Sequence, residues 1–231
     1  MNSASYHNDE LTADQKHFKP NQCILDVAFL LDGSRQVETN GEGNFHRQID
    51  FVKKAAKYLP VSRDDVHMGV GLLGDSDVMV FPMNEHYTES AVNFELDHIQ
   101  YPASSIIELE QLKSARDIML RRGTRDVAPH VFVLVTDVSS LDFYRRSVDA
   151  MRSEGTEVVL FGIGSISWEQ ELKVRSSVEG LANQVVTVQS GDEDQAVKRL
   201  AENLCKLSNE KRSDIPRQHW KYSKKVLNSK L

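Results

Sequence analysis

Short apolar runs alternate along this chain with stretches of helical period, and this alternation limits the possible folds more than any other feature. The strand-length runs cover residues 24–31, 130–136, 158–163 and 185–188. Strands that are apolar on both faces and separated by helices are typical of a parallel sheet with helices on both sides. The sequence therefore predicts an α/β, doubly wound fold with a mainly parallel sheet.

The connecting segments complete this prediction. Apolar side chains recur at helical spacing, which predicts helices over residues 44–59, 90–99, 108–121, 147–154, 168–177 and 192–204. Residues 67–73 and 78–83 flank the turn sequence Gly74-Asp75-Ser76-Asp77, so we expect a hairpin with one antiparallel edge strand. No apolar period continues after about residue 207, where we expect irregular structure.

Two cysteines bracket the predicted domain. Cys23 precedes the first predicted strand and Cys205 ends the last predicted helix. This placement favours a disulfide between the ends of the domain and therefore an oxidising compartment. The alternative is a pair of reduced, buried thiols in a cytosolic protein. We divide the chain into an N-terminal tail (1–22), one domain (23–205) and a C-terminal tail or linker (206–231).

Charge and hydropathy argue against nucleic-acid binding and against a membrane-spanning segment. The net charge of -6 does not provide the broad basic face of a sequence-independent nucleic-acid binder. No apolar run approaches the roughly 20 residues of a membrane span. The sequence predicts neither nucleic-acid binding nor a membrane span.

Acidic residues follow two of the predicted strands. Asp32 ends the first strand and Asp137 ends the strand over residues 130–136, while Ser34 lies two residues beyond Asp32. Ligands of open parallel sheets bind at the carboxyl ends of strands, and such oxygen ligands suit Mg²⁺ or Mn²⁺. The alternative is that Asp32 and Ser34 cap the next segment and Asp137 ends a strand.

Several segments resemble von Willebrand factor type A domains. The segments, in family order, are Asp26-Val27-Ala28-Phe29-Leu30-Leu31-Asp32-Gly33-Ser34, Gly43-Asn44-Phe45, Val66-His67-Met68-Gly69-Val70, Phe81-Pro82-Met83-Asn84-Glu85-His86-Tyr87, Val133-Leu134-Val135-Thr136-Asp137 and Gly155-Thr156-Glu157-Val158-Val159-Leu160-Phe161-Gly162-Ile163-Gly164. The resemblance covers residues 23–205 and is closest to extracellular-matrix members, the collagen VI-like domains and matrilins, where flanking cysteines are usual. It implies a Rossmann-like fold, secretion into the extracellular matrix, and binding to collagen or other matrix proteins.

The sequence departs from the family's metal-ion-dependent adhesion site. Asp32, Ser34 and Asp137 match its ligand positions, but the second serine position holds Gln36 and the threonine position falls on Ile106. Ser105 could replace the threonine only if the loop shifts by one residue. A glutamine carbonyl is longer and uncharged, and an isoleucine cannot coordinate a cation. We therefore expect a partly degenerate site in which Mg²⁺ or Mn²⁺ binding is weak or absent.

Three classes of function can be compared. The family resemblance favours a matrix-protein-binding module used in adhesion or assembly. A purely structural matrix module without a ligand-binding face is the alternative. An enzyme of phosphoryl or nucleotide chemistry is disfavoured, because no Gly-x-Gly-x-x-Gly follows the first strand and no Walker-type glycine loop is present.

Overall fold

A six-stranded sheet forms the centre of the protein in a computed structural model, which describes residues 22–74, 79–105, 109–126, 128–163, 185–188 and 193–214. The strands are β1 (Leu25–Asp32), β2 (Val66–Leu73), β3 (Met79–Phe81), β4 (His130–Asp137), β5 (Glu157–Ile163) and β6 (Val185–Val188). Their order is β3-β2-β1-β4-β5-β6, and only the β2–β3 pair is antiparallel. The predicted doubly wound sheet with one antiparallel edge strand is confirmed.

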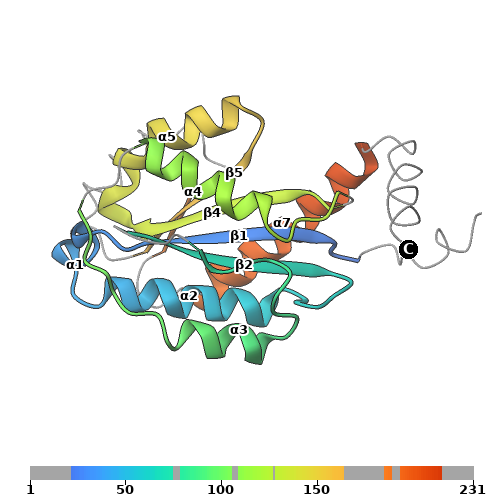
Figure 1. The fold of residues 1–231 in the computed structure, drawn as a ribbon, viewed down its shortest axis with the longest axis horizontal. Coiled ribbons are helices and arrows are strands. Elements are labelled where there is room, and N and C mark those ends of the chain that lie inside the picture. Colours follow the sequence, from blue (N-terminus) through green and yellow to red (C-terminus); the bar gives the residue numbers. More distant parts are fainter. Residues whose placement is uncertain are drawn as a thin grey trace, which may run out of the picture.

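Helices cover both faces of this sheet (Figure 1). The helices α4 (Leu109–Arg121) and α5 (Leu141–Ser153) pack on one face, and α2 (Asn44–Tyr58), α3 (Glu89–Leu96) and α7 (Glu193–Asp214) pack on the other. Successive β1 side chains enter alternate layers, because neighbouring strand residues point to opposite faces. Phe29 packs with α2 and α7, whereas Leu30 packs with α4 and α5.

The helices differ from the prediction mainly in three places. The short helix α1 (Arg35–Asn40) was not predicted, and α5 begins at Leu141 rather than at residue 147. The last helix passes the predicted domain boundary at residue 205 and continues to Asp214. Polar contacts hold this extension, which is why an apolar period did not reveal it: Ser208 is buried and Lys211 pairs with Glu157. The predicted helix over residues 168–177 lies outside the described residues.

A disulfide closes the domain at the amino end of β1. Cys23 and Cys205 are bonded, so the bridge predicted from their placement is confirmed. Next to it, the Ser208 hydroxyl donates a hydrogen bond to the carbonyl of Ile24. Both contacts attach α7 to the residues that lead into β1.

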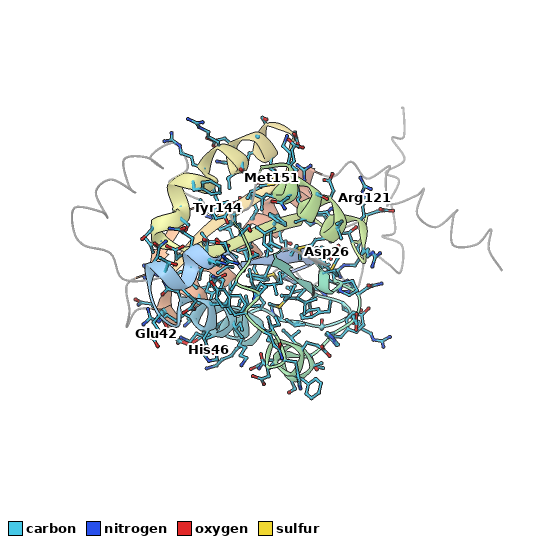
Figure 2. All side chains as sticks on the ribbon, turned by 60° about the vertical axis from the view of Figure 1, so that its left-hand side comes forward. Asp26, Glu42, His46, Arg121, Tyr144 and Met151 are labelled. Atoms are coloured by element: carbon cyan, nitrogen blue, oxygen red, sulfur yellow. A yellow bond between two sulfur atoms is a disulfide. The ribbon has the colours of Figure 1, made fainter. Side chains whose placement is uncertain are left out.

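A buried ion pair lies at the same end of the sheet. The carboxylate of Asp26 is fully buried; Arg125 donates to it from Nε at 2.8 Å, and a terminal guanidinium nitrogen lies 2.7 Å away as an ion pair. The register places His67 and His130 beside Asp26 on the two neighbouring strands. Asp26 lies toward the end of the sheet that is marked by Arg121, away from Tyr144 (Figure 2).

Candidate functional site

The strand order places a topological switch point between β1 and β4. The chain continues from β1 to β2 on one side of the sheet and from β4 to β5 on the other. Ligands of open α/β sheets bind at the carboxyl ends of strands where the connections diverge in this way. Asp32 and Asp137 are the last residues of these two strands, as predicted from the sequence.

The carboxylate of Asp32 is fully buried and fully engaged. Its Oδ1 accepts a hydrogen bond from the backbone N–H of Ser34 at 2.9 Å. Its Oδ2 accepts from the Thr136 hydroxyl at 2.6 Å and from the Tyr144 hydroxyl at 2.8 Å. The backbone N–H of Asp32 donates to the buried side chain of Gln48 at 2.8 Å, which ties α2 to the end of β1. These bonds offset the cost of removing the charge from water.

The carboxylate of Asp137 has its own set of donors. Its Oδ1 accepts from the Asn40 side-chain amide and from the backbone N–H of Ser139, both at 2.9 Å, and its Oδ2 accepts from the Ser140 hydroxyl. Burial raises the pKa of Asp137, and the nearby charge of Asp32 raises it further, while the three donors act in the opposite direction. The two carboxylates are therefore close enough to repel each other.

Tyr144 connects the Asp32 carboxylate to α5. Burial raises the pKa of its hydroxyl, as does the negative charge of Asp32, while a hydrogen bond with the Ser34 side chain opposes this rise. The phenol is consequently a neutral donor at physiological pH. Tyr144 thus contacts one of the predicted metal ligands directly, Asp32.

A second loop, residues 101–105, packs on the turn that follows β1. Ser104 forms a parallel bridge with Ser34, and its backbone N–H donates to the carbonyl of Gly33 at 3.1 Å. Gly33 is required here because a Cβ atom at this position would lie 2.4 Å from the carbonyl oxygen of Leu73. The Tyr101 hydroxyl donates to the carbonyl of Ser34 at 2.7 Å. The loop therefore holds the β1–α1 turn in place.

The predicted site residues divide into a buried group and an exposed group. Asp32, Ser34 and Asp137 are buried together, whereas Gln36 is exposed on α1 and Ser105 is exposed in the loop. The buried serine of that loop is Ser104. Ala103 has a left-handed backbone with φ of 49°, and this turn precedes the inward-facing Ser104. Ile106 lies outside the described residues.

Sequence reasoning missed several residues of this cluster: Asn40, Gln48, Ser104, Thr136, Ser140 and Tyr144. Thr136 could have been found, because it directly precedes Asp137 in a buried strand. Tyr144 could not, because its role depends on the early start of α5. The missed residues share one property, which is that they supply hydrogen-bond donors to the cluster or support its loops.

A divalent cation does not fit this arrangement without rearrangement. Asp32, Ser34 and Asp137 provide hard oxygen atoms of the kind that Mg²⁺ prefers. Each carboxylate oxygen, however, already accepts at least one hydrogen bond from a protein donor. These donors are all neutral, so the two negative charges would still attract a cation. A cation that bound these oxygens directly would have to share them with these donors or displace some of the donors.

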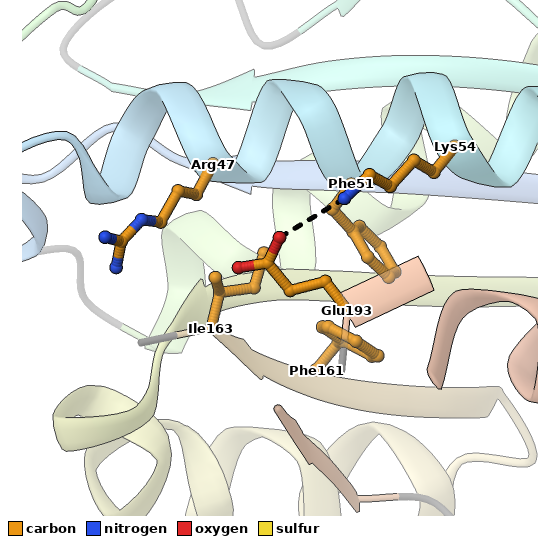
Figure 3. A pocket seen from close by; sticks show the side chains of 6 residues that line it. All are labelled: Arg47, Phe51, Lys54, Phe161, Ile163 and Glu193. Carbon is orange, nitrogen blue, oxygen red and sulfur yellow. Dashed lines mark hydrogen bonds and ion pairs between the residues drawn. The ribbon is translucent and has the colours of Figure 1, made fainter. Parts of the chain in front are cut away.

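A small cavity lies on the face of the sheet that α2 and α7 cover, between α2, β5 and the start of α7 (Figure 3). Its volume is about 10 Å³, enough for about one water, and it is lined by Arg47, Phe51, Lys54, Phe161, Ile163 and Glu193. The Lys54 ammonium pairs with Glu193 at 3.2 Å. The cavity is too small for an organic substrate.

Comparison with known sequences gives one family and several relatives. The sequence profile described as the von Willebrand factor type A domain matches residues 26–211. The mouse collagen alpha-4(VI) chain is 28% identical over 153 residues, which cover 64% of this chain and 6% of the collagen chain. Human von Willebrand factor A domain-containing protein 2 is 25% identical over 171 residues, or 72% of this chain and 22% of that protein. The chain thus spans a small part of these relatives.

Solved structures show the same fold. Proximal thread matrix protein 1 from the mussel byssus superposes with a TM-score of 0.60 at 19% identity, covering 80% of this chain and 49% of that one. Another structure of that protein, with a zinc-occupied MIDAS motif, gives a TM-score of 0.58 at 20% identity, covering 79% of this chain and 48% of that one. At this level of identity the likeness extends to the fold alone.

Proposed function

Because this chain belongs to the von Willebrand factor type A domain family, we propose that it is a secreted module that binds a collagen or another extracellular-matrix protein. Relatives that are collagen chains support this class of partner. The Cys23–Cys205 disulfide supports secretion, because disulfides persist in oxidising compartments. No helix within the described residues is long and apolar enough to cross a membrane. The proposal includes no catalysed reaction.

One observation carries the choice of binding surface: exposed side chains lie within two residues of the buried residues Ser34, Ser104, Asp137 and Tyr144. We call Gln36, Ser105, Ser139 and Phe143 the switch-point face. Phe143 is 54% exposed and its ring lies against Tyr144 at a centroid distance of 5.1 Å. Exposed aromatic side chains within a polar rim are typical of protein-binding surfaces.

The proposed binding depends little on a cation. Gln36, which holds the family's second serine position, and Ser105, which could replace the threonine after a one-residue shift, are exposed, while the carboxylates accept hydrogen bonds from protein donors. We therefore propose that the adhesion site is partly degenerate and binds Mg²⁺ or Mn²⁺ weakly. Contact with the partner would then rest on the switch-point face itself.

The test is binding of the oxidised chain to immobilised fibrillar and type VI collagens by surface plasmon resonance, in EDTA and in millimolar Mg²⁺. We expect saturable binding in both buffers and a loss of about tenfold or more for Phe143→Ser. The matched control is Phe94→Ser, because Phe94 is 62% exposed on α3, remote from the switch-point face.

Each failure has a distinct meaning. Equal losses for the two phenylalanine variants would place the binding surface elsewhere. Binding that disappears in EDTA would contradict the cation-independent mode. The absence of saturable binding to any matrix component would favour the alternative, a purely structural module of a longer matrix protein.

A further inference from the structure

The Tyr144 hydroxyl donates a hydrogen bond to Oδ2 of Asp32, an oxygen that a cation bound directly to this carboxylate would need. We infer that Tyr144 and the donors beside it replace a divalent cation in this cluster, and that Tyr144 is the residue that keeps cation affinity low. The inference deepens the proposed function and rests on its weak-cation assignment, but it can be measured without any matrix partner.

The Tyr144 hydroxyl shares its acceptor on Asp32 with a second protein donor. Its hydroxyl donates to Oδ2 of Asp32 at 2.8 Å, and the Thr136 hydroxyl donates to the same oxygen at 2.6 Å. The other oxygen of Asp32 accepts the backbone N–H of Ser34. Three donors on one buried carboxylate stabilise its charge without a metal ion.

Packing prevents Tyr144 from withdrawing easily. Its side chain is 2% exposed and belongs to the apolar layer formed by α4, α5 and one face of the sheet. In that layer Leu141, Val148 and Met151 are also buried on α5. A cation that bound Oδ2 of Asp32 directly would have to displace a hydroxyl whose ring is fixed in the core.

The second carboxylate is occupied in the same manner. Asn40, Ser139 and Ser140 supply donors to both oxygens of Asp137. The buried side-chain atoms without a partner among the described residues are His67 Nδ1, His86 Nε2 and Asn93 Oδ1, and none of them belongs to this cluster. Every carboxylate oxygen of the cluster therefore has at least one protein donor in the place of a cation.

The experiment measures Mn²⁺ binding to the oxidised full chain by electron paramagnetic resonance and by the shift in melting temperature. We expect Tyr144→Phe to be less stable than the wild type in EDTA and to bind Mn²⁺ about tenfold more tightly or better. The control is Tyr58→Phe, which also removes a tyrosine hydroxyl that donates to a carboxylate, that of Asp194, but at the α2–α7 contact. It should bind Mn²⁺ as the wild type does.

The outcomes separate this inference from the proposed function. Gained Mn²⁺ affinity that disappears in the Tyr144→Phe/Asp32→Asn double variant supports it. Equal affinity of the wild type and Tyr144→Phe overturns it, whatever the matrix-binding result. If Tyr144→Phe does not fold, the wild type still tests the inference, because micromolar Mn²⁺ binding by the wild type would by itself overturn it. Failure to bind collagen affects only the proposed function.

Discussion

Replacing Arg125 with alanine is expected to leave the Asp26 carboxylate charged and poorly paired inside the protein. The change deletes the guanidinium contacts to Asp26 at 2.7 and 2.8 Å, together with bonds to the carbonyls of Leu25 and Asp65. Breaking one partner out of a buried ion pair costs about 3–5 kcal/mol. The backbone N–H of residue 125 still donates to Asp26, and the Arg125 side chain is 19% exposed. We therefore expect a loss near the lower end, about 3 kcal/mol.

Urea unfolding followed by circular dichroism measures this loss as a change in the free energy of unfolding. The matched control is Arg121→Ala, because Arg121 is 80% exposed and its ion pair with Asp117 is long, at 3.9 Å. An exposed pair of this kind contributes about 0–1 kcal/mol. Both variants remove an arginine side chain, and the two positions are four residues apart. The difference between their losses in the free energy of unfolding therefore reports the burial and pairing of Arg125.

A double-mutant cycle tests the physical reason for the loss. In an Asp26→Asn background the charge is gone, so Arg125→Ala should cost less there than in the wild type. Equal costs in the two backgrounds would show that Arg125 acts by packing and not by pairing with Asp26. A loss below about 1 kcal/mol for Arg125→Ala alone would refute the reasoning from burial.

Three further predictions concern other parts of the fold. Cys23→Ser should lower the free energy of unfolding by up to about 5 kcal/mol, because the bridge to Cys205 spans 182 positions; equal urea midpoints with and without reductant would contradict this. Gly162→Ala places a methyl group 2.7 Å from a leucine of α5 and should cost about 1–3 kcal/mol, measured by thermal unfolding; an unchanged melting temperature would show that the leucine moves freely. Arg116 lowers the pKa of Glu154, so this pair stabilises the fold above pH 4.5 and its contribution disappears as the pH falls further. In Glu154→Gln the free energy of unfolding should therefore fall less between neutral and acidic pH than in the wild type. An unchanged dependence of that free energy on pH would exclude the pair as a cause.

Strands that are buried on both faces could be predicted because their residues form continuous apolar runs in the sequence. The run at residues 130–136 corresponds to β4, in which residues 131–137 are all buried. The predicted bounds 185–188 are also those of β6. Helix ends were less predictable where polar contacts set them. The last turns of α7 depend on Ser208 and Lys211, whose partners Ile24 and Glu157 are distant in the sequence.

The candidate site shows the same division between what a sequence records and what only packing decides. Asp32 and Asp137 were found because each ends an apolar run. Ser105 was the predicted loop serine, whereas the structure buries Ser104. Which of the two serines faces inward depends on the backbone angle at Ala103, and a sequence does not reveal that angle. Tyr144 was missed because a phenol that reaches across a helix–sheet interface has no pattern of its own in the sequence.

The position of the disulfide also has a mechanical consequence. Tension applied between the chain before Cys23 and the chain after α7 would be carried by the covalent bridge, and it could unravel only the helical residues beyond Cys205. The sheet would remain outside the line of force. The switch-point face, at the far end of the eight-residue strand β1 and roughly 26 Å away, would therefore keep its shape while the polypeptide on either side is stretched.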